Sequence, residues 1–128
     1  MEVKYVKVSQ LKKGSYVVID GVPCKVLDIE TSKPGKHGSA KARITAIGLF
    51  DNQKRNLLKP TTDTVEQPIV RRGPGQILAI VGDKLQMMDL ENYQTYEIDI
   101  PKDVPDLNPG DTVEFIQVDS NVRIVRKR

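Results

Sequence analysis

No window of eleven residues in this sequence places its apolar residues at the three- and four-residue spacing of an amphipathic helix. The apolar residues instead occur in short runs, several of which alternate with polar residues. Clusters of glycine, proline, asparagine and aspartate separate these runs. The pattern predicts an all-β fold built from short strands joined by turns.

Residues 1–68 are predicted to form a small barrel of about five short strands. The expected strands are 3–8, 15–19, 23–29, 41–50 and 54–58, with 59–65 as a further extended element. Asp20-Gly21 predicts a hairpin turn between the second and third strands, because both of its central positions favour residues that accept positive φ. In the fourth strand, alternate residues are predicted to share one face: Ala42, Ile44 and Ala46.

A domain boundary is predicted at Glu66-Gln67-Pro68, and a second break at Arg71-Arg72-Gly73-Pro74-Gly75. Residues 69–128 are then predicted to hold five strands with a longer link between the third and fourth, which is the spacing of an OB-fold. The expected strands are 77–81, 84–89, 95–100, 112–118 and 122–125. Three side chains of the third strand are predicted to point inward (Tyr96, Ile98 and Ile100), and a shift of the apolar phase at Ile116 predicts a bulge.

Positive charge is concentrated in the first half. Residues 1–68 carry 12 Lys and Arg against 7 Asp and Glu, a net charge of +5, whereas residues 69–128 carry 8 against 10, a net charge of −2. A glycine- and proline-containing loop holds four cations within eleven residues that contain no acid: Lys33, Lys36, Lys41 and Arg43. A basic half suggests a polyanionic partner such as nucleic acid, and charge alone is equally compatible with simple solubility. Arg71-Arg72 is interpreted as a solvated linker. Arg126-Lys127-Arg128 is interpreted as a frayed, solubilising end, with contact to RNA as the alternative.

The sequence offers little for catalysis or metal binding. It contains one histidine, His37, and one cysteine, Cys24, so a His/Cys metal site cannot be built within one chain. His37 lies in the glycine loop, far from any buried acid that would orient it in a catalytic triad. Cys24 lies in an apolar run and is predicted to be a core residue. The sequence therefore predicts no enzyme and no metal. The single cysteine, with no signal peptide and no membrane span, predicts a cytoplasmic protein.

The tetrad Gly35-Lys36-His37-Gly38, followed by Ala40-Lys41, resembles the translation initiation factor 5A family. The resemblance extends over the whole chain and implies an N-terminal SH3-like barrel (1–68) that carries the basic loop, followed by a C-terminal OB-fold barrel (69–128). The chain lacks the N-terminal extension of the eukaryotic members and has Ser39 where they usually carry histidine. In both respects it is similar to the archaeal branch.

The resemblance implies that deoxyhypusine synthase transfers an aminobutyl group from spermidine to Lys36, giving deoxyhypusine or hypusine, and that no other cofactor is needed. The modified arm would reach the acceptor end of peptidyl-tRNA from the exit-site region of the ribosome. There it would promote peptide-bond formation, above all at consecutive prolines. The neighbouring residues are expected to be recognised by the modifying enzyme or to contact tRNA and rRNA: Lys33, Gly35, His37, Gly38, Ser39, Lys41 and Arg43.

Other functions stay open on the sequence alone. One is a general single-stranded RNA-binding protein or RNA chaperone, which would use aromatic stacking platforms in a basic groove. The acidic second half has few aromatic residues for this, and two of them, Tyr96 and Phe115, are predicted to point inward. Another is a relative of bacterial elongation factor P, whose third domain has no counterpart in the sequence. An enzyme acting on RNA is the least favoured.

Overall fold

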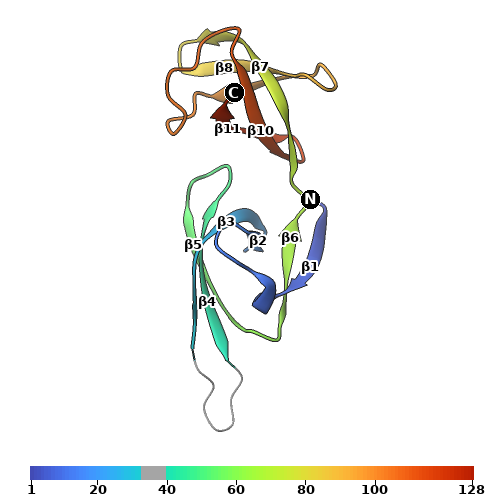
Figure 1. Cartoon of the computed structure of the whole chain (residues 1–128), viewed down its shortest axis with the longest axis vertical. Helices are drawn as coiled ribbons and strands as arrows, with labels where there is room; N and C mark the ends of the chain where they lie inside the picture. The colour runs from blue at the N-terminus through green and yellow to red at the C-terminus, as the bar shows by residue number, and fades with distance from the viewer. Residues whose placement is uncertain (33–39) are drawn as a thin grey trace. The chain divides into compact units, whose positions relative to one another are not determined.

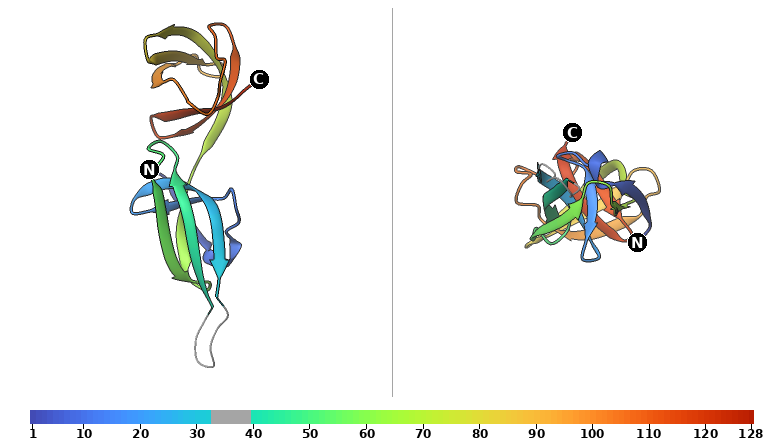
Figure 2. Two further views of the ribbon diagram at one scale, coloured as in Figure 1. Left: turned by 90° about the vertical axis from the view of Figure 1, so that its left-hand side faces the viewer. Right: turned by 90° about the horizontal axis from the view of Figure 1, so that it is seen from below.

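A computed structural model describes residues 1–32 and 40–128 of the chain. It divides into two compact units, Met1–Ile69 and Val70–Arg128. Within the described residues, the regular elements are eleven β-strands and one short 3-10 helix, η1 (Val8–Gln10). The strands of each unit form twisted, curled sheets (Figures 1 and 2). The predicted all-β fold is confirmed, with two β units as expected for an SH3-like barrel followed by an OB-fold barrel.

The first unit consists of two sheets that enclose an aliphatic core. A two-stranded sheet pairs β1 with β6, and a four-stranded sheet has the order β2-β3-β4-β5, with antiparallel pairing throughout. The strands are β1 (Val3–Lys7), β2 (Tyr16–Ile19), β3 (Val22–Thr31), β4 (Lys41–Gly48), β5 (Lys54–Pro60) and β6 (Thr64–Pro68). The core includes Val17, Ile19, Cys24, Val26, Ala42, Ile44, Ala46 and Val65.

Two local predictions for this unit are confirmed. Asp20 and Gly21 join β2 to β3 with φ values of 52° and 76°, as a two-residue hairpin turn requires. The predicted inner face of β4 is buried, because Ala42, Ile44 and Ala46 all belong to the core. The buried face of β4 therefore anchors the strand that leads out of the basic loop.

Residues 66–68, where the sequence placed a domain boundary, form the end of β6, and the first unit ends one residue later, at Ile69. Pro68 lies opposite Val3 of β1. The next residue, Ile69, donates its backbone N–H to Glu2. Because hydrogen-bonded positions alternate along an antiparallel pair, the backbone nitrogen of residue 68 points away from β1. Proline lacks an N–H, and at such a position it costs no hydrogen bond. The chain leaves the first unit only after Ile69.

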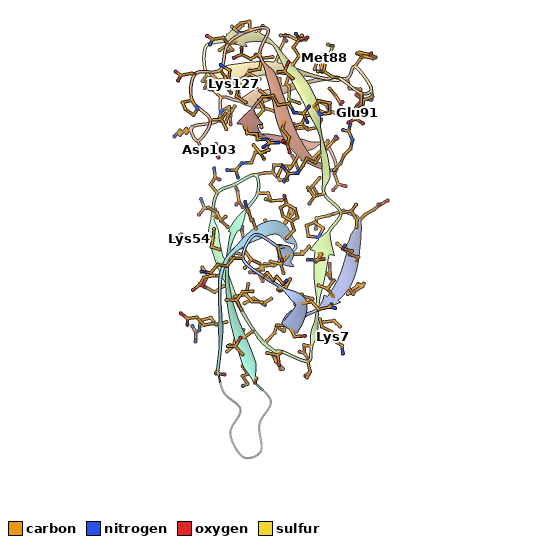
Figure 3. All side chains as sticks on the ribbon, viewed as in Figure 1. Lys7, Lys54, Met88, Glu91, Asp103 and Lys127 are labelled. Atoms are coloured by element: carbon orange, nitrogen blue, oxygen red, sulfur yellow. The ribbon has the colours of Figure 1, made fainter. Side chains whose placement is uncertain are left out.

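The second unit is a single antiparallel five-stranded sheet with the order β11-β10-β7-β8-β9. Its strands are β7 (Arg71–Val81), β8 (Lys84–Asp89), β9 (Thr95–Asp99), β10 (Thr112–Val118) and β11 (Asn121–Lys127). Side chains fill the interior of this unit, as they do in the first (Figure 3). The core includes Ile77, Leu85, Met87, Val113, Phe115 and Ile124.

The predicted break at residues 71–75 is wrong, because β7 begins at Arg71 and runs through them. Gly75 serves close packing, since a Cβ at this position would lie 2.7 Å from the Met87 sulfur. Further along β7, the apolar run is not continuously buried, because Val81 is 74% exposed. Ile100 follows the end of β9 and is exposed instead of pointing inward. The bulge in β10 lies between Glu114 and Phe115, before the predicted position at Ile116.

Candidate functional site

The base of the β3–β4 hairpin is the part of the basic loop that the structure describes. Ser32 donates its backbone N–H to the carbonyl of Lys41 at 2.9 Å, and its hydroxyl also donates to that carbonyl at 3.2 Å. Ala40 is fixed from the other side, because its carbonyl accepts the backbone N–H of Thr61 at 2.9 Å. These hydrogen bonds hold together the two chain positions from which the loop departs.

Two of the predicted site residues, Lys41 and Arg43, lie on β4. Both side chains are exposed, on the face opposite the buried Ala42 and Ile44. They are therefore available to a partner beside the loop base. The pairing of β3 with β4 places Glu30 directly opposite Arg43. In the sequence, Glu30 precedes the acid-free stretch of residues 33–43. Strand pairing nevertheless places this residue beside Arg43, a neighbour that the sequence alone did not show.

The remaining predicted site residues lie outside the described residues: Lys33, Gly35, Lys36, His37, Gly38 and Ser39. The structure therefore describes the strands that flank this segment, β3 and β4, and not the segment itself. Their register, with Thr31 opposite Ala42, fixes where the segment begins and ends on the first unit. For Lys36 itself, the expectation continues to rest on the sequence motif.

Cys24 is fully buried on β3, as predicted, and its thiol donates to the carbonyl of Val22 at 3.3 Å. Burial raises the pKa of this thiol above its usual value. Cys24 is thus a neutral core residue at physiological pH. Over residues 1–32 and 40–128, no three His, Cys, Asp or Glu side chains come together in an arrangement that could hold a metal ion.

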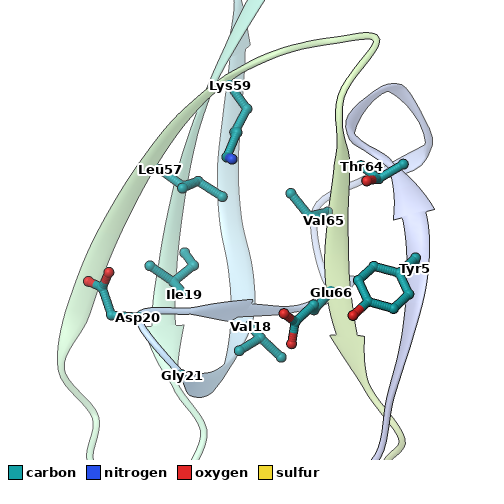
Figure 4. Close-up of a pocket in the computed structure, with 10 residues that line it drawn as sticks. All are labelled: Tyr5, Val18, Ile19, Asp20, Gly21, Leu57, Lys59, Thr64, Val65 and Glu66. Atoms are coloured by element: carbon teal, nitrogen blue, oxygen red, sulfur yellow. The ribbon is translucent and has the colours of Figure 1, made fainter.

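A pocket of about 270 Å³ lies in the first unit between β5 and β6, with β2 crossing beneath it (Figure 4). The two flanking strands are joined through a turn but do not pair with each other. The lining combines aliphatic side chains with exposed polar and charged ones: Tyr5, Val18, Ile19, Asp20, Leu57, Lys59, Thr64, Val65 and Glu66. The pocket is smaller than most cofactor sites, so we assign no ligand to it.

Asp89, at the end of β8, is a buried carboxylate that the sequence did not reveal. Arg71 donates to it from Nη1 at 2.7 Å and from Nη2 at 3.3 Å, and also donates to Gln117 at 2.9 Å. The Arg71 guanidinium lies 5.4 Å from the centroid of the Phe115 ring. The predicted role of Arg71 as part of a solvated linker is therefore wrong. Successive residues of a strand point to opposite faces, so a strand through residues 71–75 would have placed Arg71 and Arg72 on opposite faces of the sheet. This was the signal that the sequence offered and that was missed.

Arg72 and the C-terminal residues are also ordered by ion pairs. Glu114 on β10 is buried and contacts both Arg72 and Arg126, while Lys127 lies 3.2 Å from a carboxylate oxygen of Asp111. The backbone N–H of Arg128 donates to Thr112. The C-terminal residues thus belong to the sheet of the second unit, which corrects the prediction of a frayed end.

No helix among the described residues has the length and apolar character needed to cross a membrane.

Comparison with known proteins matches residues 2–63 to the family model described as "Translation initiation factor 5A-like, N-terminal". The curated translation initiation factor 5A of Methanocaldococcus jannaschii is 50% identical over 96% of this chain and 93% of its own length. That of Sulfurisphaera tokodaii is 50% identical over 98% of both chains.

Solved structures agree over nearly the whole chain. The structure described as eukaryotic translation initiation factor 5A from Methanococcus jannaschii matches with a TM-score of 0.88 and 48% identity, over 98% of this chain and 96% of that one. A family member from Naegleria fowleri matches with a TM-score of 0.73 and 30% identity, over 100% and 99%. Both the fold and the sequence therefore show that this chain belongs to the translation initiation factor 5A family, whose members are non-enzymatic translation factors.

Proposed function

We propose that this chain binds the ribosome and promotes peptide-bond formation through a deoxyhypusine or hypusine at Lys36. The supporting observation is full-length membership of the translation initiation factor 5A family together with the motif Gly35-Lys36-His37-Gly38. The motif falls between two strands whose ends are hydrogen-bonded at Ser32 and Lys41. A hairpin with a fixed base is a suitable carrier for a long cationic arm.

The modified Lys36 side chain acts by positioning another molecule and takes no part in the chemistry itself. Unmodified lysine carries one ammonium group, with a pKa near 10.4. Transfer of an aminobutyl group from spermidine by deoxyhypusine synthase breaks the C–N bond that joins this group to the rest of spermidine and forms a new C–N bond at the Lys36 amine, with 1,3-diaminopropane as the leaving group. The transfer lengthens the arm and adds a second amine. The arm then reaches the acceptor end of peptidyl-tRNA and holds it in a reactive orientation, while the ribosome performs the chemistry. The gain is greatest where peptide bonds form slowly, as at consecutive prolines.

Contacts beside the arm would hold the factor on RNA. Lys41 and Arg43 are exposed on β4, next to the departure point of the loop. Lysine and arginine side chains bind phosphate and ribose and thereby position a protein without reading base sequence. We assign the same role to Lys33, and recognition by the modifying enzyme to the glycines that flank Lys36.

A general single-stranded RNA-binding protein is less well supported. Such proteins stack bases on exposed aromatic side chains. In the second unit Phe115 is fully buried and Tyr96 is half-buried, which leaves Tyr93, 70% exposed, as its one exposed aromatic. A stacking surface for several bases is therefore not available on this unit.

The test is the Lys36→Arg variant in a reconstituted translation system that makes a peptide with consecutive prolines. Arginine keeps a positive charge but cannot accept the aminobutyl group. We expect the modified wild-type protein to stimulate synthesis and the variant to give no stimulation, with an unchanged circular dichroism spectrum and melting temperature. Full stimulation by Lys36→Arg would refute the proposed role of the modified side chain.

A further inference from the structure

The carboxylate of Glu114, on β10, lies between two arginines from the neighbouring strands. Arg72 on β7 donates from Nη1 to Oε1 and Arg126 on β11 donates from Nε to Oε2, each over 2.5 Å. Because β10 lies between β7 and β11 in the sheet, three adjacent strands bring these groups together. The register pairs Glu114 directly with Arg126 and places Arg72 opposite Ile116, two residues along β10. The cluster is thus built on paired strands and not on a loop.

Glu114 is buried and its two partners are not. The side chain of Glu114 is 5% exposed, whereas those of Arg72 and Arg126 are 55% and 69% exposed. The carboxylate is therefore covered by two cationic groups that still present much of their surface to solvent.

The cluster carries a surplus of positive charge. The hydrogen bond from Arg72, and next that from Arg126, hold the pKa of Glu114 below its usual value, so the carboxylate is ionised at neutral pH. One carboxylate against two guanidinium groups leaves a local charge of +1. The second half of the chain as a whole has a net charge of −2. A positive patch on an otherwise acidic unit favours an anion at one place and one orientation.

We propose that Arg72 and Arg126, held in place by Glu114, bind a backbone phosphate of RNA. This inference rests on the proposed function, in which the chain works on the RNA-rich ribosome. The planar fork of arginine matches the geometry of a phosphate group. Glu114 is a positioning residue, since it orders both side chains before the ligand arrives and so reduces the entropy lost on binding. A contact of this kind places the second unit on RNA without reading sequence.

The experiment measures binding of the full chain to a fluorescein-labelled RNA hairpin of about 20 nucleotides by anisotropy, with KCl varied from about 50 to 200 mM. Arg72→Ala and Arg126→Ala are each expected to weaken binding about five- to tenfold and to lower the salt dependence by about one counterion. Lys84→Ala is the matched control. It makes the same charge change in the same unit by removing an exposed ion pair with Asp99, and we expect less than about a twofold effect.

Glu114→Gln separates a positioned site from a mere accumulation of charge. The substitution removes one negative charge and so raises the net charge of the protein by one. Electrostatic attraction alone would therefore tighten RNA binding. Loss of the carboxylate that holds Arg72 and Arg126 has the opposite effect, and we expect binding to weaken about threefold. Melting temperatures establish that each variant is folded. Arg72→Lys keeps the charge and an ion pair, so it carries the test if Arg72→Ala unfolds, and it is expected to bind more weakly than wild type because lysine lacks the fork.

Three results would overturn the inference. One is an effect of Arg72→Ala and Arg126→Ala no larger than that of Lys84→Ala, and another is tighter binding by Glu114→Gln. The third is equal displacement of the RNA by poly-glutamate at matched charge, which would make the site a docking point for an acidic protein. None of these measurements depends on Lys36. Repeating the series in the Lys36→Ala background thus distinguishes failure of this site from failure of the proposed function.

Discussion

Replacing Arg71 with methionine removes the partner of a fully buried carboxylate. Asp89 is 0% exposed and accepts two hydrogen bonds from Arg71, at 2.7 and 3.3 Å. Removing one member of a buried ion pair typically costs about 3–5 kcal/mol. We expect about 2–3 kcal/mol here, because Arg71 is 36% exposed and the backbone N–H of Glu91 still donates to Asp89. This range includes the free energy lost when the Arg71 guanidinium no longer lies over the Phe115 ring.

The same substitution reverses the contribution of Asp89 to the acid response of the second unit. Burial raises the pKa of Asp89, but hydrogen bonds from Arg71 and from the Glu91 backbone outweigh it and leave the pKa below its usual value. The wild-type carboxylate therefore stabilises the fold above its unfolded pKa of about 4, and this contribution is lost as pH falls through the lower folded pKa. In Arg71→Met, burial dominates and raises the pKa, so protonation favours the folded state. The difference in unfolding free energy between the two proteins is expected to shrink between about pH 7 and pH 3.

Urea denaturation followed by circular dichroism measures both effects, and tyrosine fluorescence gives a second probe because the chain has no tryptophan. We expect the melting temperature of the second unit to fall by about 10–20 °C at neutral pH. Lys84→Met is the control. Its partner Asp99 is 81% exposed, so this variant is expected to leave the denaturation midpoint nearly unchanged. A loss in Arg71→Met no greater than in this control, or a difference that widens in acid, would contradict the reasoning.

Two further predictions concern the cores of the two units. Gly75→Ala places a Cβ 2.7 Å from the Met87 sulfur and 3.2 Å from Phe115, and we expect it to destabilise the second unit by about 1–3 kcal/mol in urea denaturation; an unchanged midpoint would contradict the packing. Cys24 is fully buried with a raised pKa, so the folded protein is expected to react with a thiol reagent such as dithionitrobenzoate far more slowly than the urea-unfolded protein. Equal rates would show that the first unit opens readily around β3.

The sequence predicted the elements whose signals are local. Asp20-Gly21 produces its turn because both positions must accept positive φ, and the structure gives both of them positive φ. The alternation of Ala42, Ile44 and Ala46 identified the buried face of β4, because strand side chains alternate whatever the partner strand is. Hairpins and strand faces depend on residues that are close in the chain, so they could be read without knowledge of the fold.

The errors came from residues whose role depends on a distant partner. Pro68 and Gly75 are residue types typical of strand ends and turns. Pro68 is nevertheless tolerated in β6, because its position needs no N–H donor towards β1, and Gly75 makes room for Met87. Similarly, Asp89 and Glu114 look like surface acids until pairing brings Arg71, Arg72 and Arg126 beside them. Of the candidate site, Lys41 and Arg43 lie exposed at the loop base, while Lys36 continues to rest on its motif and on the family.

The most direct test of the proposed function is peptide mass spectrometry across residues 33–41 on protein purified from its native source, where the modifying enzyme is present. We expect an aminobutyl adduct on Lys36, with an added oxygen if the side chain is hydroxylated to hypusine. In parallel, the unmodified chain is expected to accept the aminobutyl group from spermidine when incubated with deoxyhypusine synthase. An unmodified Lys36 in the native protein, together with no transfer in vitro, would contradict the proposal that a modified lysine is the working part of this protein.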